Sequence, residues 1–252
     1  FCIHAVTVSD GVDLYARTST AGAVFAVKLS GFTLQNMTSS EGAIPVKQIE
    51  QTGDTLLTHL VKVDTSAAWS YSYSYQYLFG KLAATHDSTY AYRIPWTTSE
   101  AHSVIQGYTG AFSHSDAGLE EALDFGMAEG TATLAARGGL VVEVEESYSV
   151  GGTDTALKTQ ANKVAILHSD GTVGLYLHFK KDGVSVTEGQ TVAKGDLIAY
   201  SGNTGYSTTP HLHFQVQRPL STWVLDTVAT TFTAQSGTGL TLSLGSSYTA
   251  ID

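Results

Sequence analysis

Between Trp69 and Phe79 every second residue is aromatic, and the residues between them are polar except Leu78. Successive side chains of a β-strand alternate between its two faces, so this period of two predicts a strand with aromatic rings along one face. A helix would distribute the same rings around its axis. Rings on one strand face belong most often to a core or a domain interface, and stacking on sugar rings is the alternative.

Short segments of this kind recur along the whole chain. Its 252 residues include 25 Gly and 13 Tyr but only 4 Pro, a composition typical of many short strands joined by turns. A chain of this length can hold two domains, each with a core of its own. We therefore predict an all-β protein with an N-terminal β-sandwich-like module at residues 1–90, based on alternating segments at residues 5–16, 24–34 and 55–63.

Residues 91–222 predict a second β domain, and residues 223–252 predict a C-terminal hairpin that could pack on the N-terminal module. Strand-like segments of the second domain alternate with glycine turns and lie at residues 130–136, 139–145, 163–168, 173–178, 196–201 and 211–217. Only residues 117–123 are compatible with a helix.

Charge and hydropathy argue against several kinds of partner. The formal net charge is −10 and no cluster of Lys or Arg occurs, which disfavours a nucleic-acid or anionic-membrane partner. No apolar run approaches the roughly 20 residues that a transmembrane helix needs. Cys2 is the only cysteine, so no internal disulfide can form. The start at Phe1, without Met, is compatible with a processed exported protein or a trimmed sequence.

His211 and His213 lie two residues apart in a predicted strand that follows a glycine-containing loop at residues 202–209. Side chains at this spacing project from the same side of a strand, so both imidazoles can reach one metal ion. A lone His-x-His pair also occurs by chance in many strands. Four further residues strengthen the metal interpretation and precede the pair: His114, Asp124, His168 and His178.

Between residues 106 and 218 the chain resembles the lysostaphin-type, or LytM-like, zinc endopeptidases, which are peptidoglycan hydrolases. Several blocks carry the resemblance in the expected order, at residues 106–108 (QGY), 122–125 (ALDF), 135–142 (AARGGLVV), 176–178 (YLH), 189–196 (GQTVAKGD) and 211–214 (HLHF). The resemblance implies that residues 91–222 form a LytM-like catalytic domain, an antiparallel β fold with a duplicated hybrid motif.

By position, the resemblance implies that His114, Asp124 and His213 are the ligands of one Zn²⁺ per chain, with water in the fourth place. Two neutral imidazoles and one carboxylate leave a net charge of +1 on such a site, which lowers the pKa of a bound water to about 7. Nine residues separate His114 from Asp124, more than in the commoner family pattern. A longer loop must therefore bulge between them, and Asp116 is the alternative ligand.

The resemblance also implies catalytic residues that do not bind the metal. His178 and His211 match histidines of which one takes the proton of the water and both can stabilise or protonate the intermediate. Tyr108 matches a tyrosine that donates a hydrogen bond to the oxyanion, and a buried core tyrosine is the alternative interpretation. His168 matches no ligand and is expected to line the cleft or to orient a ligand.

The resemblance implies a zinc-dependent endopeptidase that hydrolyses peptide bonds in peptidoglycan stem peptides or cross-bridges. The alternatives are a secreted metalloprotease that acts on a glycine-rich protein matrix and a non-catalytic LytM-like binding or regulatory module. A sequence pI near 5.2 disfavours attraction to the anionic polymers of a thick Gram-positive wall. We therefore expect an exported protein, either periplasmic or secreted.

Overall fold

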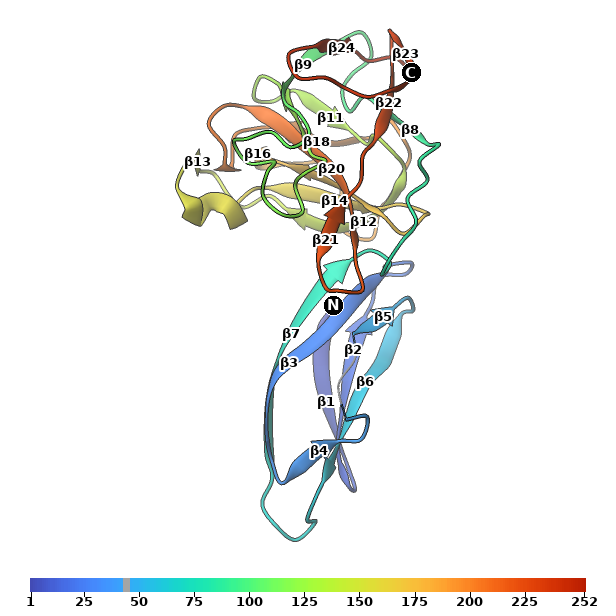
Figure 1. The fold of residues 1–252 in the computed structure, drawn as a ribbon, viewed down its shortest axis with the longest axis vertical. Helices are drawn as coiled ribbons and strands as arrows, with labels where there is room; N and C mark the ends of the chain where they lie inside the picture. Colours follow the sequence, from blue (N-terminus) through green and yellow to red (C-terminus); the bar gives the residue numbers. More distant parts are fainter. Residues whose placement is uncertain (43–45) are drawn as a thin grey trace. The chain divides into compact units, whose positions relative to one another are not determined.

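The computed structural model describes residues 1–42 and 46–252, and β-strands form most of its regular structure (Figure 1). The chain folds into two compact units, Phe1–Leu82 and Ala83–Asp252. The single helix of the described residues is one 3₁₀ segment at Thr155–Thr159. The predicted all-β class is confirmed. Within the same residues, no helix has the length and apolar character needed to cross a bilayer.

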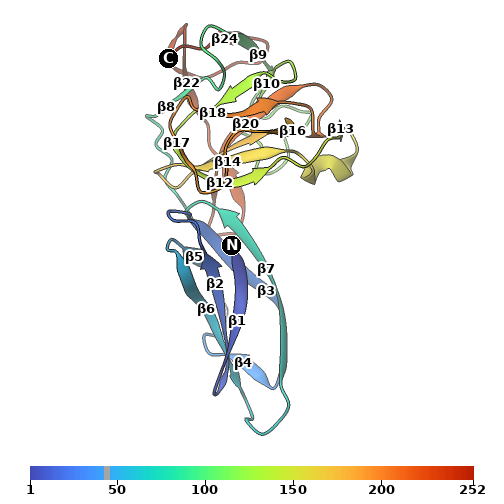
Figure 2. The same ribbon diagram turned by 180° about the vertical axis from the view of Figure 1, so that it is seen from behind.

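The first unit is a sandwich of two sheets (Figure 2). One sheet has the order β1–β2–β6–β4, with bounds Cys2–Val8, Gly11–Thr18, Gly53–Lys62 and Met37–Ser39. The other has the order β5–β3–β7, with bounds Lys47–Ile49, Phe25–Gln35 and Ser70–Phe79. Alternate residues of both sheets meet in one core, for example Leu14 of β2 and Val27 of β3. Apolar burial between two sheets holds this unit together.

The aromatic row of β7 is mainly structural. Trp69, Tyr71 and Tyr73 pack against the core of the first unit, with neighbouring rings nearly parallel and their centroids 6.3 and 6.4 Å apart. Only Tyr75 and Tyr77 of this row are largely exposed. The row therefore follows the core interpretation over most of its length.

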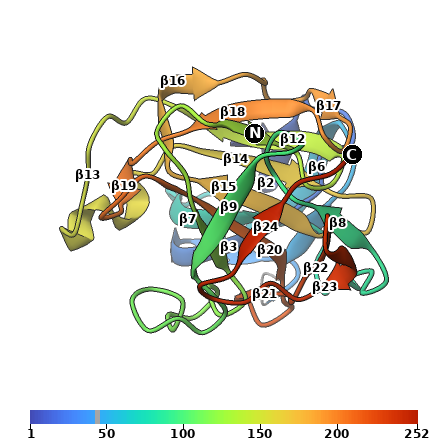
Figure 3. The same cartoon turned by 90° about the horizontal axis from the view of Figure 1, so that it is seen from above.

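The second unit is built on a nine-stranded sheet (Figure 3). Eight strands follow the order β17–β12–β14–β15–β20–β10–β9–β24, and β21 also pairs with β20. Their bounds, in the same order, are Thr191–Val192, Gly139–Glu145, Lys163–Leu167, Val173–Leu177, His211–Pro219, Leu123–Gly126, Ala101–Gln106 and Ser247–Thr249, with β21 at Leu225–Thr227.

Smaller sheets complete the second unit. The order β11–β18–β16 has bounds Ala132–Leu134, Leu197–Ser201 and Phe179–Val184. The order β23–β22–β8 has bounds Gly237–Leu240, Thr231–Ala234 and Ala91–Arg93. Two short strands, β13 at Gly151–Gly152 and β19 at Gly205–Tyr206, pair in parallel and hold the start of the loop before β20.

The structure differs from the predicted domain limits at both ends of the second unit. The boundary was expected near residue 90, but Ala83 already donates its backbone N–H to Pro219 and Asp87 donates to Asp170, both within the second unit. The predicted C-terminal hairpin also belongs to the second unit. The reason is that the C-terminal strands form backbone hydrogen bonds with strand edges of the second unit. Strand β22 pairs with β8, and β24 pairs with β9.

Strand β20 lies inside the second unit and is buried on both faces. Leu212, Phe214 and Val216 are at most 1% exposed and enter the main core. Because side chains alternate along a strand, His211 and His213 project from the opposite face. A hydrophobic core on one side of β20 therefore fixes the direction of both histidines on the other.

An ion pair between the buried Arg137 and the partly buried Asp170 anchors the turn between β14 and β15. Arg137 donates to Asp170 over 2.7 Å, and its guanidinium lies 4.3 Å from the ring centroid of Tyr90. Asp170 also accepts from the Thr172 backbone and hydroxyl and from the Asp87 backbone. Burial alone would raise the pKa of Asp170, but these hydrogen bonds and Arg137 lower that pKa well below its usual range.

We expect Asp170→Asn to lower the free energy of unfolding at pH 7 by about 2–4 kcal/mol, because Arg137 then stays buried without a counter-charge. The folded-state pKa of Asp170 is depressed, so the carboxylate stabilises fully above its unfolded pKa of about 4. That contribution is lost as pH falls through the folded pKa. Urea unfolding between pH 7 and pH 3 should show the gap between the two proteins narrowing with falling pH.

The matched control is Asp182→Asn, because Asp182 is exposed on β16. We expect this change to alter stability by less than about 0.5 kcal/mol at any pH in the series. A constant gap between Asp170→Asn and the native protein across the series would contradict the role given to the ion pair.

Candidate metal centre

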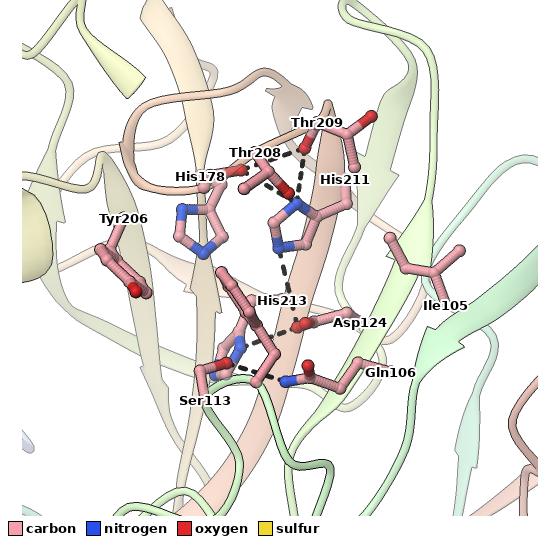
Figure 4. A pocket seen from close by; sticks show the side chains of 12 residues that line it. Ile105, Gln106, Ser113, Asp124, His178, Tyr206, Thr208, Thr209, His211 and His213 are labelled. Carbon is pink, nitrogen blue, oxygen red and sulfur yellow. Dashed lines mark hydrogen bonds and ion pairs between the residues drawn. The ribbon is translucent and has the colours of Figure 1, made fainter. Parts of the chain in front are cut away.

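Strand pairing places His213 opposite Asp124. Asp124 on β10 is the register partner of His213 on β20, and the His213 Nδ1 atom lies 2.9 Å from Asp124 Oδ1 (Figure 4). Both side chains are buried. Residues directly opposite each other on antiparallel strands have close Cβ atoms, so the sheet itself sets this contact.

His114 reaches the same carboxylate from the connection between β9 and β10. Its Nδ1–H donates to the Gly107 carbonyl over 2.9 Å, which leaves a lone pair on Nε2. That Nε2 atom is fully buried, has no hydrogen-bond partner and lies 3.2 Å from Asp124 Oδ1. Burial lowers the pKa of His114, but the hydrogen bond and charge of Asp124 outweigh it and raise that pKa, so this buried pair attracts a cation, either a proton or a metal ion.

The three residues satisfy the requirements of a metal site. One ligand atom from each of His114, Asp124 and His213 lies within 4.8 Å of the other two. Two imidazole nitrogens and one carboxylate oxygen form a donor set that is typical of zinc with an open fourth position. Burial raises the pKa of Asp124, but His114 and His213 outweigh it and lower that pKa strongly, so the carboxylate is ionised. This donor set therefore fits a divalent cation.

His178 and His211 lie beside the metal ligands (Figure 4), with ring centroids 4.5 Å apart. His178 follows β15 in a left-handed backbone conformation (φ 71°), and its Nδ1–H donates to the Thr204 carbonyl over 2.6 Å. His211 Nδ1–H donates to the Thr209 carbonyl over 2.7 Å, and its Nε2 lies 3.7 Å from Asp124 Oδ1. Each ring therefore keeps a lone pair on Nε2.

Burial keeps these two rings neutral. It lowers the pKa of His178 to about 3, and the neighbouring His211 and His213 contribute to the same change. Burial also lowers the pKa of His211, although Asp124 opposes this change. A neutral imidazole with a free Nε2 can accept a proton, so both rings are in the form that a general base needs.

Tyr108 is not brought into this group. Its hydroxyl donates to the Thr230 carbonyl over 3.1 Å and accepts from the Thr230 backbone N–H over 2.9 Å. The ring packs against the main core of the second unit, and the residue does not line the cavity at the metal ligands. Its placement agrees with the core-tyrosine alternative.

Two other residues considered from the sequence also lie apart from the ligands. Asp116, the alternative ligand, pairs with Lys158 over 2.8 Å at the surface. His168 is buried and hydrogen bonded to the Gly138 carbonyl, so it neither lines the cavity nor contacts a ligand. The helix-compatible stretch at residues 117–123 forms turns, which let the long connection bulge between His114 and Asp124.

A cavity of about 340 Å³ opens at the ligands (Figure 4). The loop at residues 202–209 lines one side through Ser207, Thr208 and Thr209, as the sequence led us to expect. Gln106 and Phe112, which the sequence analysis did not name as site residues, also line the cavity. Phe112 stacks on Tyr206 of β19, with ring centroids 5.5 Å apart.

The sheet register explains why Gln106 lies at the site, because Gln106 on β9 is the register partner of Asp124 on β10. A second cavity of about 140 Å³ shares His178, His213 and Tyr206 with the first and is floored by Leu119 and Leu177. Of the three ligands, His213 borders both cavities and Asp124 borders the larger one.

Comparison with known proteins gives a consistent family match. Residues 118–224 match the profile described as "Peptidase family M23". His213 and Asp124 fall inside this match, whereas His114 precedes it.

Two curated relatives and one solved structure illustrate the match. Lysostaphin of Staphylococcus simulans is 38% identical over 99 residues, which are 39% of this chain and 18% of the relative. The peptidoglycan DD-endopeptidase ShyA of Vibrio cholerae is 36% identical over 93 residues, 37% of this chain and 19% of the relative. The chain thus spans only about a fifth of their length. A crystal structure of the lysostaphin catalytic domain, 30% identical, covers 47% of this chain and 79% of that chain with a TM-score of 0.34.

We expect the purified chain, once reconstituted with zinc, to hold one ion per chain, measured by elemental analysis. His213→Ala should lower the zinc affinity by more than about 100-fold, because it removes a ligand and leaves Asp124 without its cross-strand partner. His168→Asn is the matched control, since it changes a buried histidine outside the cluster and should keep the ion. Absence of zinc from the native protein, or equal affinity in His213→Ala, would contradict the site.

Proposed function

We propose that this chain is a zinc-dependent endopeptidase that hydrolyses peptide bonds in peptidoglycan, because residues 118–224 match the profile of peptidase family M23. The observation that carries the proposal is one arrangement of five buried groups. His114, Asp124 and His213 converge on a cation site, and the free Nε2 atoms of His178 and His211 border the same space. Two relatives of this chain, the glycyl-glycine endopeptidase ALE-1 of Staphylococcus capitis and the DD-endopeptidase ShyA, support the reaction class by their names.

A bound zinc ion would supply Lewis-acid polarisation of a peptide carbonyl and lower the pKa of water at the site to about 7. His211 is the proposed general base, because its Nε2 lies 3.7 Å from the ligand oxygen of Asp124. Once protonated, its Nδ1–H is still held by the Thr209 carbonyl, which stabilises the imidazolium. The protonated His211 could then give this proton to the leaving amine, and His178, held by the Thr204 carbonyl, borders the same space.

The cavity favours a substrate recognised through its backbone. Ser113, Ser207 and Thr208 offer hydroxyl groups along the wall, and the described residues that line the larger hollow include no Lys or Arg. Hydroxyl groups can bond the amides of residues with small side chains, such as those of peptidoglycan stem peptides and cross-bridges. Action on such a polymer requires that the protein reach the cell wall, so the proposal includes export to the periplasm or the medium.

We expect His211→Ala to lower hydrolysis of purified sacculi by about 10²–10⁴-fold while keeping its zinc, because it removes the proton acceptor and no metal ligand. Released muropeptides, identified by mass spectrometry, give the rate and the bond cleaved. His59→Ala in the first unit is the matched control and should keep the native rate. A chelator should abolish activity, and zinc should restore it.

The alternatives predict different results in the same assay. Full activity of His211→Ala would refute the assigned mechanism. Peptide release from elastin with intact sacculi left behind would favour a protease of protein matrices. Binding of sacculi with no released peptide would favour a non-catalytic module.

Tyr108→Phe tests whether Tyr108 takes part in the reaction. Its hydroxyl is already bonded to Thr230, so we expect hydrolysis to stay within about threefold of the native rate. The free energy of unfolding should fall by about 1 kcal/mol, since the hydroxyl both donates and accepts in a largely buried site. Urea unfolding and the sacculus assay measure the two effects. A loss of hydrolysis above about 100-fold with unchanged stability would restore the oxyanion role.

A further inference from the structure

We propose that the smaller cavity is a subsite for an aliphatic side chain of the substrate residue next to the scissile bond. The enzyme then prefers bonds flanked by alanine or a larger aliphatic residue to glycyl-glycine bonds. The inference deepens the proposed function and rests on it. The cavity measures about 140 Å³ and is bordered by His178 and His213, which also line the larger cavity (Figure 4). A side chain bound there belongs to a residue close to the reacting bond.

Aliphatic side chains from three separate segments line the smaller cavity. They are Leu119 of the long connection, Leu177 at the end of β15 and Ala161 after the 3₁₀ segment. Each of the three residues is only partly buried, so apolar surface remains for a ligand to cover. An apolar cavity of about 150 Å³ can hold a benzene molecule, so this one has room for a side chain of up to about four carbons.

Backbone hydrogen bonds hold Leu119 in place. The N–H of Asp116 donates to the Ser113 carbonyl, that of Leu119 to the Asp116 carbonyl and that of Ala122 to the Leu119 carbonyl, over 3.0–3.2 Å. The long connection is therefore a series of turns, each closed by its own hydrogen bond. These turns build one wall of the cavity, to which Ser113, Asp116 and Leu119 contribute side chains.

A glycine sets the position of a second wall. Gly205 of β19 has a φ of 81°, and an added Cβ would lie 2.7–2.9 Å from atoms of Ala161. Because Gly205 has no side chain, β19 packs directly against Ala161, and the next residue, Tyr206, lines the cavity. The Thr204 hydroxyl also accepts from the Asn162 backbone N–H over 3.0 Å, which ties the same two segments together.

An ion pair lies at the mouth of the smaller cavity. Asp116 and Lys158 line it, are joined over 2.8 Å and have side chains that are about half exposed. Lys158 also lies 5.6 Å from the ring centroid of Tyr206. The two charges neutralise each other, so the mouth attracts neither sign of charge. The aliphatic interior would take water away from a polar side chain. The subsite therefore selects an aliphatic group.

The first test measures binding to His211→Ala, because His211 lines only the larger cavity and its loss slows hydrolysis. Pentaglycine is compared with peptides in which one glycine is replaced by alanine, leucine or asparagine, as the L or D isomer. Leucine methyl NMR signals, assigned with Leu119→Ile and Leu177→Ile, report on the cavity. A leucyl peptide should shift both signals and bind at least about 10-fold more tightly than pentaglycine. Asparagine, of similar size, should give no such gain.

The second test measures hydrolysis of the same peptides by the native protein, with products identified by mass spectrometry. Cleavage should occur beside the substituted residue, with a kcat/KM for alanine or leucine at least about 10-fold above that of pentaglycine. Leu119→Phe fills the cavity and should bring this ratio to within about threefold of one. Leu197→Phe is the matched control, since exposed Leu197 on β18 lines neither cavity and should keep the native ratio.

Pentaglycine as the best ligand or the best substrate would overturn the proposal, as would a native ratio in Leu119→Phe. Circular dichroism and zinc content check that this variant keeps its fold and its ion. If it does not fold, Leu119→Ala takes its place, and the wider cavity should shift the preference from alanine toward leucine. Binding of the leucyl peptide as expected, with no peptide hydrolysed by the native protein, would overturn the proposed function and support the subsite, because the binding test needs no turnover.

Discussion

The pairing of β20 with β10 is the constraint on which the site depends. β20 is buried on both faces, and its alternation sends Leu212, Phe214 and Val216 into the core and the residues between them to the other side. A shift of one residue in register would exchange these sets, at the cost of burying imidazoles among apolar side chains. The hydrophobic core thereby holds His213 opposite Asp124 without any contribution from the metal.

Most of the fold prediction came from residue types that alternate with a period of two along the sequence. The aromatic row of β7 and the His-x-His pair of β20 gave the strand type and the side-chain faces directly, because a strand has only two faces. Domain limits were harder to predict. Residues 83–90 and the C-terminal strands join the second unit through backbone hydrogen bonds to strand edges, which depend on no particular side chain and leave no sequence signal.

The proposed ligands and histidines could be identified by order and residue type, since the chemistry of the site demands imidazoles and a carboxylate. Residues whose side-chain type the proposed reaction does not require were harder to predict. Tyr108 has the spacing of a catalytic residue, yet its hydroxyl is taken by Thr230, a partner 122 positions away. Phe112 borders the cavity through its ring contact with Tyr206, and nothing in its local sequence distinguishes it from any other loop residue.

His178 shows what such a site costs the fold. Its backbone has a φ of 71°, a conformation that glycine or asparagine adopts more easily than histidine. The bond from its ring to Thr204 holds the residue there. Selection for thermal stability alone would therefore favour replacing this histidine. The strained residue also borders the proposed reaction space, so thermal stability and catalytic activity place opposite demands on this position. Mutagenesis that aims at a more stable protein must therefore leave His178 unchanged.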